Sequence, residues 1–248
     1  MQAIILAAGT GSRLRPLTND VPKCMVKVNG VPMIERAIDA LVAAGIKKLV
    51  IGLGYKSQVL KDFIRSTFTQ DRLQGMQIEF GENPDYDKTN NIYSLYLLKE
   101  FFKADDTLLL ESDLVYNPQI IKDLAAAPQK NLSVVSHWQD WMDGTVTLLD
   151  KDDNITNFIV KKDQKAEQKP DYYKTVNIYK FSKEFTNNYY LPFLETFMNV
   201  FGKNSYYETC LKFIAQTDPT LLKAFKIDQS LWYEVDNADD LKVAESRF

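Results

Sequence analysis

The fold is decided by the stretch Leu6-Ala7-Ala8-Gly9-Thr10-Gly11-Ser12-Arg13-Leu14, which ends an apolar run and is soon followed by Pro22-Lys23. The apolar run is expected to be a strand, so the glycines come at its carboxyl end. Gly9 and Gly11 let the backbone approach an anion and aim its N–H groups at phosphate oxygens. Arg13 and Lys23 add positive charge, unless both are simply solvated surface cations. This arrangement predicts a loop that holds the phosphates of a nucleoside triphosphate.

The glycine spacing differs from two common phosphate-binding motifs. Gly9-Thr10-Gly11 lacks the third glycine of the dinucleotide fingerprint, and no Gly-Lys-Ser/Thr follows it as in a P-loop. Two glycines alone would also suit an ordinary strand-to-loop turn. The longer run, which continues through Pro22-Lys23-Cys24-Met25-Val26 and Val28-Asn29-Gly30-Val31-Pro32-Met33-Ile34, resembles the signature of nucleotidyltransferases that activate sugar phosphates and small alcohol phosphates. The resemblance extends over essentially the full chain.

Length and charge limit the class of protein. With 248 residues, 45% of them hydrophobic, the chain is long enough for one large domain over 1–248. We expect a nucleotide-binding half at 1–115 and an acceptor-binding half, with closing elements, at 116–248. The net charge is −3, with acids and bases interspersed. This argues against nucleic acid or an anionic membrane as a partner.

The two cysteines and the first residues of the chain indicate where in the cell the protein is expected. Cys24 and Cys210 are far apart in the sequence and lack metal-type spacing, so we expect two reduced thiols. The chain begins directly with a strand, and no apolar run approaches the roughly 18 residues of a membrane span. The expected location is the cytoplasm. Homodimer formation and fusion to another enzyme domain are both left open.

Apolar runs alternate with helical patterns in the first half, as in a mostly parallel, buried sheet. Strands are expected at 2–8, 49–53, 76–80 and 108–110, and helices at 32–44, 57–68 and 91–102. More closely spaced strands are expected at 132–136, 145–149, 155–160 and 175–181, then helices at 182–201 and 206–217, and a closing helix at 238–246. Residues 161–169 are polar enough for a mobile loop. The predicted fold is α/β: a Rossmann-like, mixed but mostly parallel sheet sandwiched by helices, with a small antiparallel extension on the acceptor side.

Two aspartates follow apolar strands in the two halves of the chain. Asp113 ends Leu110-Glu111-Ser112-Asp113, and Asp236 ends Trp232-Tyr233-Glu234-Val235-Asp236. In the family that the chain resembles, an aspartate at each matching place coordinates Mg²⁺ on the triphosphate, and this ion needs few carboxylates. The alternative is an ordinary strand-end acid or, for Asp236, a helix cap. Glu111 and Glu234 would point to the same face as Asp113 and Asp236 only if each strand continued to its aspartate.

No general base is in evidence. His137 is the single histidine, and no Ser-His-Asp or Cys-His arrangement is available. Nucleotidyl transfer to a phosphate or phosphonate needs none, because the attacking oxygen is already anionic, and catalysis can depend on positioning and charge neutralisation. We therefore assign Lys23 to the α-phosphate and the incoming acceptor, and Arg13 to the leaving pyrophosphate.

The segment from Tyr86 to Tyr96 indicates the nucleotide. Hexose-activating relatives carry a Gly-Thr-Ala run here, whereas this chain has Asn90-Asn91-Ile92-Tyr93-Ser94-Leu95. That run is similar to bacterial phosphocholine cytidylyltransferases and to cytidylyltransferases acting on 2-aminoethylphosphonate. Asn90 and Ser94 match the amide-like edge of cytosine, unless Asn90 only caps the helix. The expected nucleotide-binding residues are Leu6, Ala7, Ala8, Gly9, Thr10, Gly11, Asn90, Ser94 and Glu111.

Two segments are candidates for the acceptor site. His137 to Asp143 contains Trp141 and Asp143, a combination that suits an ammonium group, although the tryptophans could equally pack in the core. Tyr173, Lys174 and Asn177 lie on the expected acceptor-side strand, where Lys174 could hold the acceptor's phosphate. The family's usual glycine is absent there, and Val176-Asn177 takes its place. A hexose is therefore a poor expectation.

The hypothesis is a CTP-dependent cytidylyltransferase that couples CMP to 2-aminoethylphosphonate, phosphocholine or a similar acceptor. The acid-rich segment from Asp140 to Asp143 favours a primary ammonium, because it could accept hydrogen bonds from one. The alternatives are a sugar-1-phosphate nucleotidylyltransferase and, from another class, a non-catalytic nucleotide-binding regulatory module.

Overall fold

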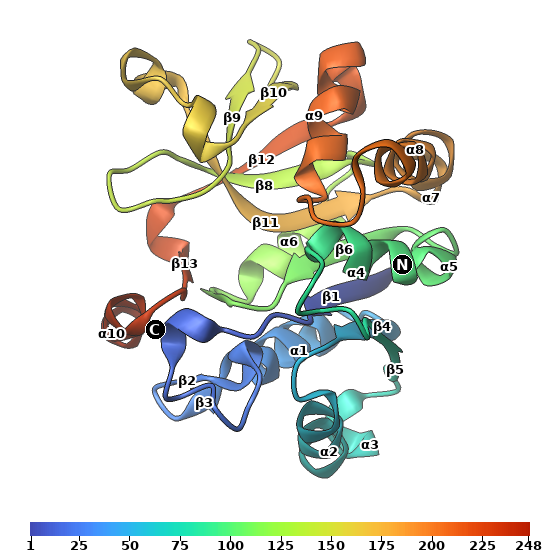
Figure 1. Cartoon of the computed structure of the whole chain (residues 1–248), viewed down its shortest axis with the longest axis vertical. Coiled ribbons are helices and arrows are strands. Elements are labelled where there is room, and N and C mark those ends of the chain that lie inside the picture. Colours follow the sequence, from blue (N-terminus) through green and yellow to red (C-terminus); the bar gives the residue numbers. More distant parts are fainter.

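A nine-stranded sheet runs through the molecule in the computed structural model, which describes residues 1–248 (Figure 1). Its first part is fully parallel, in the order β6 (Thr107–Glu111), β1 (Gln2–Ala7), β4 (Lys48–Leu53) and β5 (Gln77–Glu82). The crossovers contain α1 (Met33–Ala43), α2 (Ser57–Thr67), α3 (Gln70–Leu73), α4 (Asn91–Leu97) and α5 (Lys99–Phe102). The predicted parallel α/β half is confirmed.

The second part of the sheet is mainly antiparallel and joins the first at one strand. β11 (Tyr173–Phe181) pairs antiparallel with β6, so both halves of the chain share one sheet. The remaining strands are β8 (Leu132–His137), β9 (Val146–Leu149), β10 (Ile155–Ile159) and β12 (Lys223–Ile227). β11 pairs antiparallel with β8 and β9, and β9 with β10, whereas β12 lies parallel to β8. The predicted antiparallel extension is therefore present.

Alternation along β1 sends side chains to two separate cores. Ala3 and Ile5 belong to a core that includes side chains of α1, α2 and α6 (Gln119–Ala126). Ile4 and Leu6 belong to a second core beneath α4, α8 (Leu191–Phe201) and α9 (Glu208–Thr217). The sheet is thus covered on both faces, as a fully apolar parallel strand requires.

Short elements outside the main sheet complete the chain. β7 (Leu114–Tyr116) pairs with β13 (Trp232–Glu234), and β2 (Lys27–Val28) pairs with β3 (Val31–Pro32), both antiparallel. α10 (Ala238–Arg247) closes the chain. No sequence pattern predicted β2, β3, β7, α3 or α6. None of the helices has both the length and the apolar composition needed to cross a membrane.

Two predicted helices are broken. The helix expected at 91–102 divides at Leu98, whose side chain lies against the glycines of β4 and β5, Gly52 and Gly81. The helix expected at 182–201 becomes α7 (Lys183–Phe185), a π-helical turn at Thr186–Tyr190 and then α8. The polar segment 161–169, expected as a loop, contains 3₁₀ turns at Lys161–Asp163 and Ala166–Asp171.

Candidate active site

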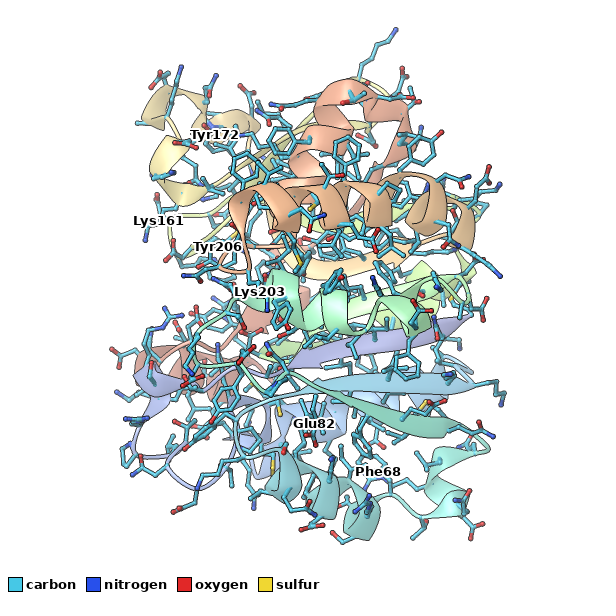
Figure 2. All side chains as sticks on the ribbon, turned by 45° about the vertical axis from the view of Figure 1, so that its right-hand side comes forward. Phe68, Glu82, Lys161, Tyr172, Lys203 and Tyr206 are labelled. Carbon is cyan, nitrogen blue, oxygen red and sulfur yellow. The ribbon has the colours of Figure 1, made fainter.

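A cavity of about 990 Å³ opens at the carboxyl ends of β1 and β6, where parallel sheets place their ligands. Its lining includes the glycine loop after β1, the start of α4, the turn after β10 and the first turns of α9. Figure 2 shows Lys161 and Tyr206, which both line the cavity, on the same side of the molecule. Residues from both halves of the chain therefore enclose one space.

Lys23 is held between the two predicted metal-binding aspartates. Its Nζ lies 2.7 Å from Asp113 Oδ2 and 2.5 Å from Asp236 Oδ1. Burial opposes the charged form of Lys23, but the two carboxylates outweigh burial and raise its pKa above the ordinary value. Lys23 therefore stays protonated throughout the physiological range and presents a fixed positive charge.

The two aspartates meet because β7 and β13 pair. Asp113 directly precedes β7, and Asp236 is the second residue after β13. The pairing sets Glu234 opposite Leu114, and the Val235 amide donates to the Asp113 carbonyl at 2.9 Å. Strands that are far apart in the sequence thus bring Asp113 and Asp236 to the same place.

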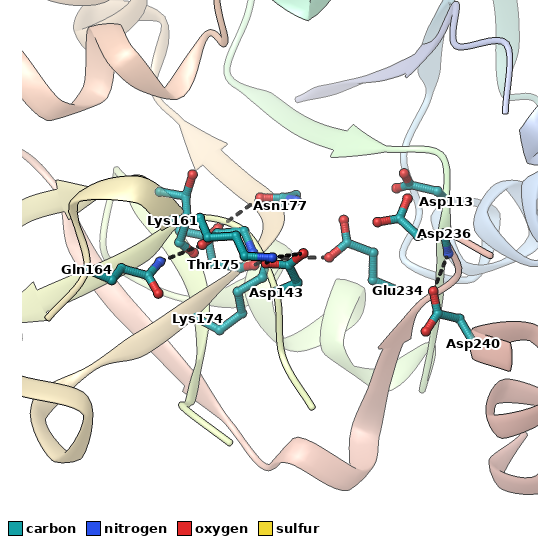
Figure 3. A network of polar contacts seen from close by, with 12 residues as sticks. Asp113, Asp143, Lys161, Gln164, Lys174, Thr175, Asn177, Glu234, Asp236 and Asp240 are labelled. Carbon is teal, nitrogen blue, oxygen red and sulfur yellow. Dashed lines mark hydrogen bonds and ion pairs between the residues drawn. The ribbon is translucent and has the colours of Figure 1, made fainter. Parts of the chain in front are cut away.

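Glu234 is the third carboxylate of this group. Oxygen atoms of Asp113, Glu234 and Asp236 lie within 4.8 Å of one another, and Asp113 Oδ1 is buried without a hydrogen-bond partner. Hard carboxylate oxygens are the protein ligands that Mg²⁺ prefers, so this donor set fits that ion. Figure 3 shows Glu234 between Lys174 and the two aspartates. Glu234 was expected to face the same way as Asp236 only if the strand continued to Asp236. β13 ends at Glu234 itself, so that condition is not met, yet the three carboxylates still lie together.

The glycine loop sets the distance between the backbone and Lys23. Gly11 has a left-handed φ of 61°, and a Cβ there would come within 2.9 Å of Lys23 Cβ. Arg13 follows in a 3₁₀ turn, and its Nη2 lies 2.8 Å from Asp236 Oδ1. Its side chain is 65% exposed, so it remains accessible to a ligand. Burial on its own would raise the pKa of Asp236, but Lys23 and Arg13 lower it overall.

All of the predicted nucleotide-binding residues line the cavity: Leu6, Ala7, Ala8, Gly9, Thr10, Gly11, Asn90, Ser94 and Glu111. Asn90 is also the helix cap that was left open as an alternative, because its Oδ1 accepts from the Asn91 amide at 2.8 Å. Ser94 Oγ accepts from Asn83 Nδ2 at 3.0 Å. Tyr93 and Tyr96 stack on one another outside the lining.

Three of the predicted acceptor-binding residues line the other end of the cavity. Lys174 is 1% exposed, and its Nζ donates to the Thr175 carbonyl at 2.6 Å and lies 3.4 Å from Glu234 Oε2. Asn177 occupies the left-handed region with φ 59°, in an irregular part of β11 where its pairing with β8 shifts. Asn177 thus takes the backbone conformation that a glycine adopts readily, yet keeps a side chain in the lining. Asp143 is the third of these residues.

The other two predicted acceptor-binding residues, Trp141 and Tyr173, do not line the cavity. Trp141 stacks on Tyr233 with ring centroids 4.7 Å apart, which is the core packing left open in the sequence analysis. The Tyr173 ring lies against His137 instead. Side chains alternate along a strand, so Tyr173 faces away from Lys174.

Glu208 and Asn91 line the cavity but were not predicted. Asn91 Nδ2 donates to Glu111 Oε1 at 3.1 Å, and Asn91 Oδ1 accepts from the Tyr207 amide at 3.1 Å. It therefore connects the end of β6 with the start of α9. Burial, together with Asp113 and Glu208, raises the pKa of Glu111. Glu208 gave no sequence signal, because it only joins the site through the packing of α9.

The sequence model of the nucleotidyl transferase family matches residues 2–245. The chain belongs to the nucleotidyl transferase family. This confirms the resemblance seen in the glycine loop and assigns the chain to enzymes that transfer nucleotidyl groups. The cavity with Lys23 and the three carboxylates is thus the candidate active site of a nucleotidyl transferase.

Three relatives of this nucleotidyl transferase are informative. It is 30% identical to CMP-5'-(3-aminopropyl)phosphonate synthase of Streptomyces rubellomurinus over its whole length, but spans only 39% of that protein. It is 30% identical to CTP:phosphoglutamine cytidylyltransferase of Campylobacter jejuni, over 98% of both chains. The solved structure of CTP:phosphocholine cytidylyltransferase from Streptococcus pneumoniae superposes with a TM-score of 0.80 and 25% identity, covering 99% of this chain and 97% of that one.

Proposed function

We propose that this nucleotidyl transferase uses CTP to transfer CMP to a small phosphonate or phosphate that carries an amine, with release of pyrophosphate. The observation that carries the proposal is the position of Lys23, at 2.7 and 2.5 Å from Asp113 and Asp236 beside the glycine loop. The names of the three relatives support the choice of nucleotide, because each one contains CMP or CTP. Each also contains an acceptor with a nitrogen group.

The transfer is a displacement at the α-phosphorus of CTP. An oxygen of the acceptor's phosphonate or phosphate forms the new P–O bond, and the bond between the α-phosphorus and the oxygen shared with the β-phosphate breaks. The electron pair leaves with pyrophosphate. Since the attacking oxygen is already anionic, the protein has to position the two anions and neutralise the charge between them.

Lys23 and Arg13 supply that positive charge in the proposed reaction. Lys23 is half-buried, protonated and fixed in place between two carboxylates, so it suits the α-phosphate and the incoming oxygen, which must lie close together. Arg13 is exposed at the mouth of the cavity and suits the departing pyrophosphate. Lys174, with its ammonium at the far side of Glu234, suits the acceptor's phosphate or phosphonate.

Asp113, Glu234 and Asp236 would hold Mg²⁺ in this reaction. When bound, the ion withdraws negative charge from the phosphate oxygens of the nucleotide. In the protein alone, Lys23 and Arg13 keep Asp236 ionised, since they lower its pKa. The carboxylate is therefore ready to bind a cation at neutral pH.

The decisive experiment measures pyrophosphate release with CTP and Mg²⁺, with 2-aminoethylphosphonate, phosphocholine and glucose 1-phosphate offered separately. We expect turnover with an amine-bearing acceptor, and Asp113→Ala should reduce it by on the order of 100-fold or more. Asp123→Ala is the matched control, because Asp123 lies on the exposed surface of α6. Turnover of the hexose alone would instead assign sugar activation, and CTP binding without any turnover would favour the regulatory module.

A further inference from the structure

The acid-rich segment that suggested an ammonium site is already neutralised by this chain's own lysines. Asp143 lies 2.9 Å from Lys161 Nζ, and Asp140 lies 3.8 Å from Lys169 Nζ. The Gly144 amide also donates to Asp143 at 2.7 Å. An ammonium group that entered here would have to displace existing partners. A carboxylate that can attract an ammonium group must therefore come from another part of the cavity wall.

Glu208 supplies such a carboxylate. It lines the cavity from the first turn of α9, the residue is only 8% exposed, and its Oε2 is buried without a hydrogen-bond partner. Glu208 forms no salt bridge, and the cation that acts on it most, Lys174, donates to the Thr175 carbonyl. Burying an ionised carboxylate without a partner costs several kcal/mol, so a cation that enters the cavity would be attracted to this oxygen.

Glu111 adds a second carboxylate to the same wall. It also lines the cavity, and the one hydrogen bond to its side chain comes from Asn91 Nδ2. Glu208 directly follows Tyr207, whose amide donates to the same Asn91, so the two acids lie on neighbouring parts of the cavity wall. Through Asn91 and the Tyr207 amide, the loop before α9 is tied to the end of β6. These contacts give the pair of acids a fixed place.

We propose that Glu208, with Glu111 beside it, is the subsite for the positively charged nitrogen of the acceptor, and that this nitrogen is a primary ammonium group. The inference rests on the proposed function and deepens it by naming the acceptor class. Lys174 and Lys23 would take the anionic end of the same acceptor, and Glu208 the cationic end.

The two tryptophans of the segment from His137 to Asp143 are not available to a quaternary ammonium. Such a group has no N–H and is recognised mainly by aromatic faces. Trp138 and Trp141 are covered by the chain's own cations, with Lys169 Nζ 4.2 Å from one ring centroid and the Arg247 guanidinium 5.1 Å from the other. Neither ring lines the cavity. An unpartnered carboxylate oxygen needs an N–H donor, which only the primary ammonium provides.

The test compares acceptors that differ at the nitrogen end alone. Pyrophosphate release is measured with CTP and Mg²⁺ on phosphoethanolamine, phosphocholine and ethyl phosphate, which carry a primary ammonium, a quaternary ammonium and no nitrogen. Wild type should prefer phosphoethanolamine. Glu208→Gln should lower kcat/KM for phosphoethanolamine by about 10- to 100-fold, mainly through KM, and should change kcat/KM for ethyl phosphate far less. Glu111→Gln should act in the same direction if Glu208→Gln does not fold.

Glu184→Gln is the matched control, because Glu184 is exposed and paired with Lys130 far from the cavity. The inference is overturned if Glu208→Gln keeps the wild-type preference, if phosphocholine is used as well as phosphoethanolamine, or if Asp143→Asn removes the preference instead. In all three results wild type still turns over an amine-bearing acceptor, so the proposed function would stand. Absence of turnover with every acceptor would overturn the proposed function, and this inference with it.

Discussion

Glu208 couples the stability of the protein to pH. Burial raises its pKa to about 7 from an ordinary value of 4.5; its own backbone hydrogen bond and Lys174 oppose the rise, and Glu234 and Asp113 add to it. A pKa raised by folding means that the full contribution of this group to stability is present below pH 4.5 and is lost as pH rises through 7.

We expect Glu208→Gln, which cannot ionise, to be more stable than wild type at pH 8 by up to about 3 kcal/mol, and to show little difference at pH 4.5. Urea unfolding of both proteins at the two pH values measures this. The exposed Glu184→Gln should change stability by less than about 0.5 kcal/mol at either pH. An equal difference at both pH values would contradict ionisation of Glu208 as the cause.

Gly11 is required by conformation and by space. Its φ is 61°, and an added Cβ would meet Lys23 Cβ at 2.9 Å and Thr18 Cγ2 at 3.0 Å. Gly11→Ala should therefore destabilise the protein by about 1–2 kcal/mol and displace Lys23. Gly9→Ala is the comparison for stability, because a Cβ at Gly9 meets nothing within 4 Å. Equal melting temperatures of the two variants would show that the close approach to Lys23 is not needed.

At the scale of elements, Asn91 connects α4 to two distant segments. It holds Glu111 at the end of β6 and the Tyr207 amide before α9. Asn91→Ala leaves the buried Tyr207 amide without an acceptor, so it should cost about 1–3 kcal/mol of stability. Because α9 carries Glu208, KM for an amine-bearing acceptor should also rise.

The matched control is Asn187→Ala. Asn187 also makes two hydrogen bonds, to the carbonyls of Lys103 and Lys183, but it is half-buried and does not line the cavity. This variant should lose stability without a change in KM. If both variants change KM equally, the effect of Asn91 comes from general destabilisation rather than from the position of α9.

Across the whole molecule, one cavity is lined by residues from both halves of the chain, so a nucleotide bound there would stabilise the folded state of both. CTP with Mg²⁺ at about 100 times its Kd should stabilise the fold by about 2.7 kcal/mol, which corresponds to a rise of about 5–10 °C in Tm. Differential scanning fluorimetry with and without a chelator measures it. In Asp236→Asn, the part of the Tm rise that a chelator removes from wild type should be absent. If the Tm of wild type rises equally with and without the chelator, the carboxylates do not hold Mg²⁺.

The sequence by itself determined the local features of this protein. The glycine loop, Lys23 and the nine nucleotide-side residues could be placed at the cavity because their positions follow from two strand ends and one helix start. Most strands of the main sheet also follow from apolar runs, and Asp113 and Asp236 from their position after two such runs. Such features depend on residues that are close together in the sequence, where strand alternation and turn chemistry act directly.

The tertiary structure alone decided which side chains meet. The pairing of β7 with β13 joins Asp113, Glu234 and Asp236, although β7 was not predicted. Trp141, expected in the acceptor site, packs on Tyr233, whereas Glu208, which gave no signal, lines the cavity. The sequence around a tryptophan or a glutamate is the same whether the side chain packs in the core or lines the cavity. Its partner comes from another segment of the chain, and the charge left unbalanced at Glu208 exists only once α9 has packed against the sheet.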